Sequence, residues 1–275
     1  MMYAIRVFTC LFVVNGLSSA LAQGLRVEAQ VYRIDRDSAN GRVAETRLSN
    51  SVTFFHSGRV YDYVESADEV IIFEPTARRF TILNTARELI TTADFDEIKH
   101  LMKFRRAESK RYLQEFRGSG SPDADKVVRS LEFQLDPKFD TKFDSAIGLL
   151  TMISPTWKYR VQTHAWQDAD QVKVYLTYAD WISQLNYVLD PASMFPEPRM
   201  LLNSKLCELN RIPTTVSLDL EADESVGLRA EHKFIKNLTD DDQHLIQAWD
   251  SAVGGGSLRK LSLRSYQEAV LVSQR

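Results

Sequence analysis

Cysteine is scarce in this sequence, which holds only Cys10 and Cys207 among 275 residues. Two cysteines cannot build a disulfide framework, so a hydrophobic core must stabilise the fold. Long apolar runs are also missing, since no internal stretch approaches the ~20 apolar residues of a membrane-spanning helix. Positive charge is not in excess, because 34 Lys and Arg face 37 Asp and Glu. Nucleic-acid-binding domains are typically strongly basic. We therefore expect no nucleic-acid partner and no transmembrane segment.

Recognisable catalytic motifs are missing as well. The sequence contains no Gly-x-Ser-x-Gly nucleophile elbow, and no Gly-x-Gly-x-x-Gly follows a strand-like run. No two of the five histidines have the i, i+4 spacing of a helical zinc site. We predict no catalytic residues, no metal site and no cofactor. The histidines are His56, His100, His164, His232 and His244.

Three features have both a functional and a structural interpretation. His232 could be a ligand or a base, but its position on an apolar strand face favours a hydrogen-bonded core histidine. Cys207 could be a nucleophile, but a lone cysteine more often acts as a small buried hydrophobe. The run Asp240-Asp241-Asp242 lacks the spacing and the glycine of a calcium loop, and follows Thr239 as helix-capping charges would.

The first 22 residues have the pattern of a secretory signal peptide. Arg6 supplies a positive charge, Val7–Val14 forms a short apolar run, and Ala20-Leu21-Ala22 matches the small-x-small cleavage site. The apolar part is too short to span a bilayer, which favours a cleavable signal peptide over a membrane anchor. We expect cleavage directly after Ala22, before Gln23. The expected location of the protein is therefore the periplasm or the exterior of the cell.

The rest of the chain opens with two hairpin signals. Asn40-Gly41 is the pair typical of a type I′ turn and separates the strand-like runs 25–35 and 42–56. A two-residue loop there would place Val27 opposite Phe54. Ser57-Gly58 predicts a second hairpin with Phe54 opposite Tyr61. Together the two registers place seven residues on one face: Val27, Ala29, Val31, Val52, Phe54, Tyr61 and Tyr63.

Hydrophobic periodicity predicts the remaining elements. Further strands are expected at 69–74, 79–84, 87–91, 147–153, 157–165, 214–220 and 228–234. Helices are expected at 94–117, 168–190, 199–209 and after Thr239. Strands in runs, followed by helices, indicate an α+β fold. We predict a large curved antiparallel sheet, similar to a half-barrel, with helices packed on one face. Residues 23–253 are expected to form one domain, followed by a flexible tail at 254–275.

Five aromatic residues are the candidate binding residues. Phe54, Tyr61 and Tyr63 share the predicted face of the first hairpins, and Trp157 and Tyr159 share a face of a later one. These side chains could be ordinary core. They could instead line an apolar cleft, in which tyrosine hydroxyls add a few polar contacts.

Three segments carry a resemblance: Gly58–Val64 (GRVYDYV), Glu69–Pro75 (EVIIFEP) and Arg79–Leu83 (RFTIL). They resemble an uncharacterised family of exported bacterial proteins. The architecture is similar to that of periplasmic lipoprotein carriers of the LolA/LolB type. That resemblance implies a half-open barrel whose apolar cavity holds acyl chains under a lid of helices.

The leading hypothesis is an exported, non-catalytic protein that binds an apolar or lipid-like ligand in the cell envelope. One alternative is a structural or protein-interaction module whose aromatic residues are all core. Another is a hydrolase whose carboxylates meet only in the folded chain. The sequence leaves the oligomeric state open.

Overall fold

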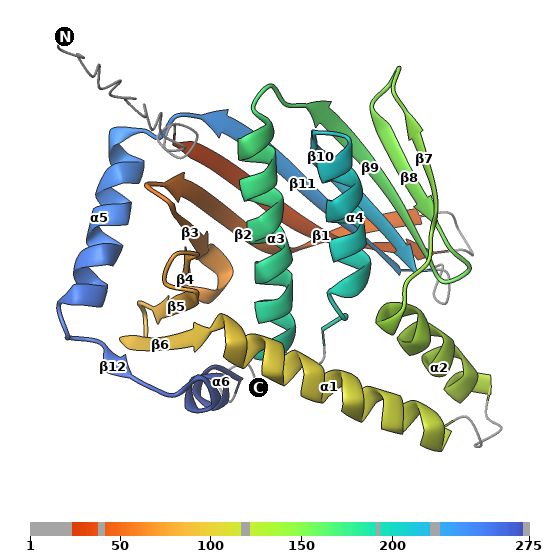
Figure 1. Ribbon diagram of the computed structural model, residues 1–275, viewed down its shortest axis with the longest axis horizontal. Helices are drawn as coiled ribbons and strands as arrows, with labels where there is room; N and C mark the ends of the chain where they lie inside the picture. The colour runs from red at the N-terminus through yellow and green to blue at the C-terminus, as the bar shows by residue number, and fades with distance from the viewer. Residues whose placement is uncertain (1–23, 38–41, 117–121, 191–192, 221–225, 272–275) are drawn as a thin grey trace, which may run out of the picture.

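The computed structural model of the protein describes residues 24–37, 42–116, 122–190, 193–220 and 226–271. The signal segment 1–22 and the Asn40-Gly41 turn lie outside these residues. Twelve strands form one open sheet, in the order β12-β6-β5-β4-β3-β2-β1-β11-β10-β9-β8-β7 (Figure 1). All neighbours are antiparallel except β12 and β6. The predicted α+β class and antiparallel sheet are confirmed.

The sheet is built from two meanders that meet at the pairing of β1 with β11. The first meander contains β1 (Leu25–Asp37), β2 (Arg42–His56), β3 (Arg59–Val64), β4 (Glu69–Glu74), β5 (Arg79–Asn84) and β6 (Leu89–Asp94). The second contains β7 (Asp140–Asp144), β8 (Leu149–Ile153), β9 (Trp157–Ala165), β10 (Arg211–Leu220) and β11 (Val226–Lys236). A 3₁₀ turn at Glu65–Ala67 joins β3 to β4.

Helices cover both faces of the sheet unequally. Five of them share one core with its first face: α1 (Phe95–Phe116), α2 (Pro122–Leu135), α3 (Ala169–Leu189), α4 (Glu197–Glu208) and α6 (Leu263–Leu271). Helix α5 (Asp240–Gly254) packs on the opposite face over β2 to β5. In Figure 1, α3 and α4 cross in front of the central strands, and α5 stands at the left, next to β3 to β5. The prediction that helices pack on one face alone is therefore wrong for α5.

The second hairpin forms in the predicted register. Ser57 and Gly58 have φ values of 48° and 77°, as a type I′ turn requires. Phe54 lies opposite Tyr61, and Val52 lies opposite Tyr63. A short loop of defined conformation fixes strand pairing.

The first hairpin is shifted from its predicted register. Val27 pairs with Thr53 instead of Phe54. A bulge near Leu48 divides the β1–β2 ladder in two, and the part nearer the turn ends with Asp37 opposite Arg42. A one-residue shift turns every side chain to the other face. Val27 therefore belongs to the core beneath α1 to α4, whereas Phe54 belongs to the core beneath α5. The prediction that these two residues share a face is wrong.

The last hairpin keeps its predicted faces although its register differs. Alternation along 214–220 and 228–234 predicts Val216 opposite His232, whereas in the structure Val216 lies opposite Ala230. A two-residue shift preserves the inward and outward sides of both strands, because side chains alternate along a strand. The sequence pattern missed α2 and β7. Residues 259–271, where it indicated a flexible tail, form β12 (Arg259–Lys260) and α6, whose Tyr266 is buried.

Helix α5 begins with a capping box that joins it to the sheet. The Thr239 hydroxyl accepts from the Asp242 backbone N–H, and the Asp242 carboxylate accepts from the Thr239 N–H. Arg26 of β1 donates to the same carboxylate over 2.7 Å. The aspartate run thus caps a helix, as predicted. The spacing of apolar residues predicts that Leu245, Ile246 and Trp249 form the buried side of this helix. Ile246 and Trp249 are buried, but Leu245 is exposed.

We expect Phe54→Ala to lower the free energy of unfolding by about 3–5 kcal/mol, because a buried ring is removed and a cavity remains. Phe54 is 2% exposed and stacks on Trp249 with ring centroids 5.9 Å apart. Urea titration measures the loss. Phe104→Ala, at a 54% exposed position, is the matched control and should change stability little. A small loss for Phe54→Ala would contradict the assigned packing.

Candidate functional site

An apolar cavity of about 370 Å³ lies between the sheet and helices α3 and α4. Its floor is formed by neighbouring strands β1, β11, β10 and β9. Pockets that hold small molecules typically measure about 300–1,000 Å³, so the volume suits one small ligand. The floor residues are Val31, Trp157, Tyr159, Val216, Leu218, Leu228, Arg229 and Ala230.

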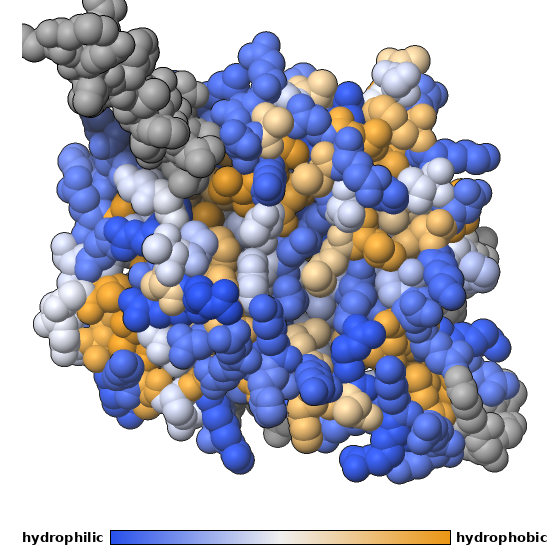
Figure 2. Space-filling model, viewed as in Figure 1, coloured by the Kyte–Doolittle hydropathy of each residue, from blue (hydrophilic) through white to orange (hydrophobic). Residues whose placement is uncertain are grey.

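The roof of the cavity is contributed by α3, α4 and the segment before α4. Ser183 and Asn186 come from α3, Arg199 comes from α4, and the segment contributes residues 193–196. On the helix side of the molecule, hydrophilic side chains cover much of the helices' outer surface and hydrophobic areas show between the elements (Figure 2). The roof therefore separates an apolar floor from a mostly polar exterior.

Several contacts fix α4 in its place over the sheet. The Phe195 ring stacks on Tyr187 of α3 with centroids 4.3 Å apart. Asn203 donates from Nδ2 to Asp180 Oδ1 over 2.7 Å, and Glu197 forms an ion pair with Arg106 of α1. These contacts link α4 and the segment before it to α3 and to α1.

The five predicted binding residues divide between the two faces of the sheet. Trp157 and Tyr159 line the cavity, with exposed fractions of 3% and 4%. Phe54, Tyr61 and Tyr63 lie under α5 and surround Trp249, with ring centroids 5.9–6.3 Å away. Alternation along β9 identified the first pair. The shifted register of β1 and β2 explains why the other three appeared to share their face with Val27.

The polar side chains of the roof gave little signal in the sequence. Arg199 occupies the first turn of α4, where a charged residue is usually solvated, yet it lines the cavity. Its positive charge acts on Tyr159, Tyr175 and His232. Burial raises the pKa of Tyr159 to about 12, and the charge of Arg199 partly opposes that rise. The phenol therefore stays neutral at physiological pH.

His232 lies near the cavity, two residues beyond Ala230 on the same side of β11. Within the described residues its Nδ1 is inaccessible and has no hydrogen-bond partner. The sequence predicted a hydrogen-bonded core histidine, and Nδ1 does not meet that expectation. Burial, assisted by the positive charge of Arg199, lowers the pKa of His232 to about 3. The imidazole is therefore neutral in the folded protein.

A buried aspartate forms a second polar group beneath α3. Asp62 accepts hydrogen bonds from the Tyr178 hydroxyl over 2.8 Å and from the Thr53 hydroxyl over 2.9 Å. Burial raises the pKa of the Asp62 carboxyl, and these hydrogen bonds oppose the rise. The shared face of Asp62 and Thr53 was evident from the strand register, but the buried partner Tyr178 comes from a distant helix.

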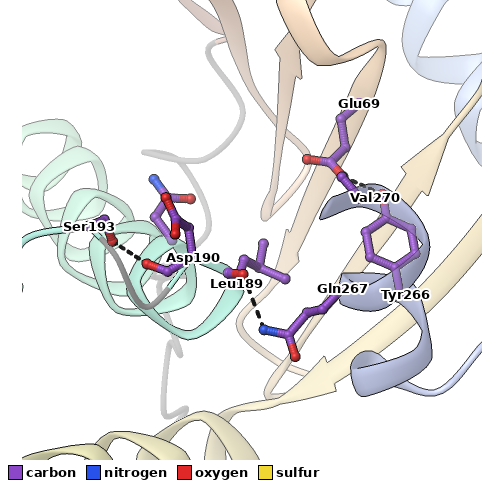
Figure 3. A pocket seen from close by; sticks show the side chains of 8 residues that line it. Glu69, Leu189, Asp190, Ser193, Tyr266, Gln267 and Val270 are labelled. Carbon is purple, nitrogen blue, oxygen red and sulfur yellow. Dashed lines mark hydrogen bonds between the residues drawn. The ribbon is translucent and has the colours of Figure 1, made fainter. Parts of the chain in front are cut away.

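A second hollow, of about 410 Å³, adjoins the apolar cavity because both are lined by Asn186 and Ser193. Several of its polar groups already bond to one another (Figure 3). The Tyr266 hydroxyl of α6 donates to Glu69, and Gln267 Nε2 donates to the Leu189 carbonyl over 3.2 Å. Burial raises the pKa of Glu69. The apolar cavity is therefore the better candidate for a binding site.

The other candidate groups lie away from the cavity. Cys207, expected to be buried, is exposed and free. Among the described residues no cluster of His, Cys, Asp or Glu could hold a metal ion. In the same part of the chain no helix is long and apolar enough to cross a membrane.

Comparison with known proteins identifies no family for this chain. No protein-family model matches it, and no curated protein matches it.

We expect the protein to lose stability as pH falls from about 6.5 towards 3, in part because of His232. The unfolded histidine binds a proton in this range, whereas the folded one, with its pKa of about 3, does not. The slope from one such group reaches about 1.4 kcal/mol per pH unit. Urea titrations at several pH values should show a shallower slope for His232→Gln.

His100→Gln removes an exposed histidine of α1 and serves as the control. Its pH profile should follow that of the wild-type protein. Asp62 is present in all three proteins, so its own titration cancels in the comparison. Identical slopes for wild type and His232→Gln would contradict the assigned burial of the imidazole.

Proposed function

We propose that this chain is an exported, non-catalytic protein that binds an apolar or lipid-like ligand in the cell envelope. The observation that carries the proposal is the apolar cavity of about 370 Å³ under α3 and α4. A concave, mostly apolar lining with a few polar groups is typical of sites that bind small molecules. The signal pattern of residues 1–22 supports the export part of the proposal.

The chemistry of the lining favours a ligand that is mainly apolar. Trp157, Tyr159 and the aliphatic side chains of β10 and β11 offer dispersion contacts and little hydrogen bonding. Burying apolar ligand surface against them contributes roughly 25 cal/mol per Å². The few polar roof groups then orient one end of the ligand. A lipid chain or another elongated apolar molecule meets both requirements.

Filling the cavity tests the proposal directly. Ala230→Phe places a ring on the cavity floor, so it should abolish binding of a neutral apolar dye such as N-phenylnaphthylamine. The melting temperature should hold or rise, because the ring occupies existing space. Dye fluorescence and differential scanning calorimetry measure the two effects. Native mass spectrometry of the purified wild-type protein would identify any lipid that remains bound.

Ala146→Phe adds the same ring at an exposed position in the turn between β7 and β8, and it should bind the dye as the wild type does. Unchanged dye binding by Ala230→Phe would contradict the proposed site. Absence of binding by the wild-type protein would favour a structural or interaction module instead.

A further inference from the structure

Arg199 is a cation without a counter-ion in the roof of the apolar cavity. Within the described chain, no hydrogen bond or ion pair engages its guanidinium group. The side chain is only half-buried, so water still solvates part of it. Enclosing a charge without a partner is unfavourable, and a ligand that brings the opposite charge removes that cost.

Arg229 is the other arginine at the cavity, but alternation along β11 turns its side chain to the opposite face of the sheet from Ala230, and there its charge is neutralised. Its two terminal nitrogens donate to the Glu45 carboxylate over 2.7 Å each. Its Nε lies 3.1 Å from Glu231, and the guanidinium stacks over the Tyr32 ring at 5.0 Å. Arg229 therefore has two carboxylates that neutralise its charge, whereas Arg199 has none among the described residues and is open to an anionic ligand.

Among the described residues, no carboxylate forms an ion pair or a hydrogen bond with Arg199. Asp180 of α3 feels its charge, yet the Asp180 carboxylate accepts its hydrogen bond from Asn203. Three further groups that feel this charge are neutral: Tyr159, Tyr175 and His232. His232 Nδ1, buried and without a partner among the described residues, adds an unsatisfied polar atom on the same side of the sheet.

We propose that the cavity binds a single-chain amphiphile whose anionic head group, a carboxylate or a phosphate monoester, pairs with Arg199. Its chain lies on the floor between Trp157 and Ala230. The inference rests on the proposed function and specifies the ligand of the same cavity. Arginine suits this role because its planar fork binds carboxylate and phosphate oxygens in pairs.

Three ligands with twelve carbon atoms each distinguish the effect of the head group from that of the chain: laurate, dodecyl phosphate and the neutral dodecanol. Displacement of N-phenylnaphthylamine from the delipidated protein gives the affinity of each. The wild-type protein should bind at least one anion about tenfold or more tightly than dodecanol. Comparison of laurate with dodecyl phosphate identifies which head group the site prefers.

Arg199→Gln should lower the affinity for the preferred anion to that for dodecanol. Arg199→Lys keeps the charge, so it should retain part of the preference and remains informative if Arg199→Gln does not fold. Arg111→Gln removes one exposed positive charge from α1 and should preserve the preference. This control separates a local pairing from a change in net charge.

The outcomes distinguish this inference from the proposed function. Equal wild-type affinity for anions and dodecanol, or an anion preference that survives in Arg199→Gln, would overturn the inference and leave the proposed function standing. Failure of the wild-type protein to bind any of the three ligands or the dye would overturn both.

Discussion

The pairing of β1 with β11 is the interaction on which the whole architecture depends. It runs from Leu25 opposite Lys236 to Asp35 opposite Val226, and it joins the two meanders into one sheet. The cavity floor crosses this junction, since Val31 comes from the first meander and the other floor residues come from the second. Neither meander alone could form the floor.

The two faces of the sheet are packed differently. Beneath α5, Phe54 and Tyr61 pack against Trp249 in a second, smaller core. The Tyr61 hydroxyl also donates to Asp250, which Arg59 holds with two hydrogen bonds. Beneath α3 and α4, longer strands and a roof of helices leave space beside Trp157. The larger hydrophobic core and the apolar cavity therefore lie on the same face of the sheet.

Local sequence signals predicted the parts of the fold that local chemistry determines. Ser57-Gly58 fixed the β2–β3 register because a two-residue turn permits one pairing. The β1–β2 register could not be read in the same way, since a bulge near Leu48 interrupts the ladder. Alternation along β9 found Trp157 and Tyr159. The role of Arg199 depends on where α4 crosses the sheet, and only tertiary packing determines that.

The open sheet has two edges, and both are built in ways that discourage aggregation. Strand β12 has only two residues, Arg259 and Lys260, and both are exposed and basic. Strand β7 is five residues long and presents Asp140, Lys142 and Asp144 to solvent. Short, charged edge strands are poor templates for another chain, because pairing would bring charges together and gain few hydrogen bonds. A sheet of twelve strands can therefore remain unclosed without adding strands from neighbouring molecules.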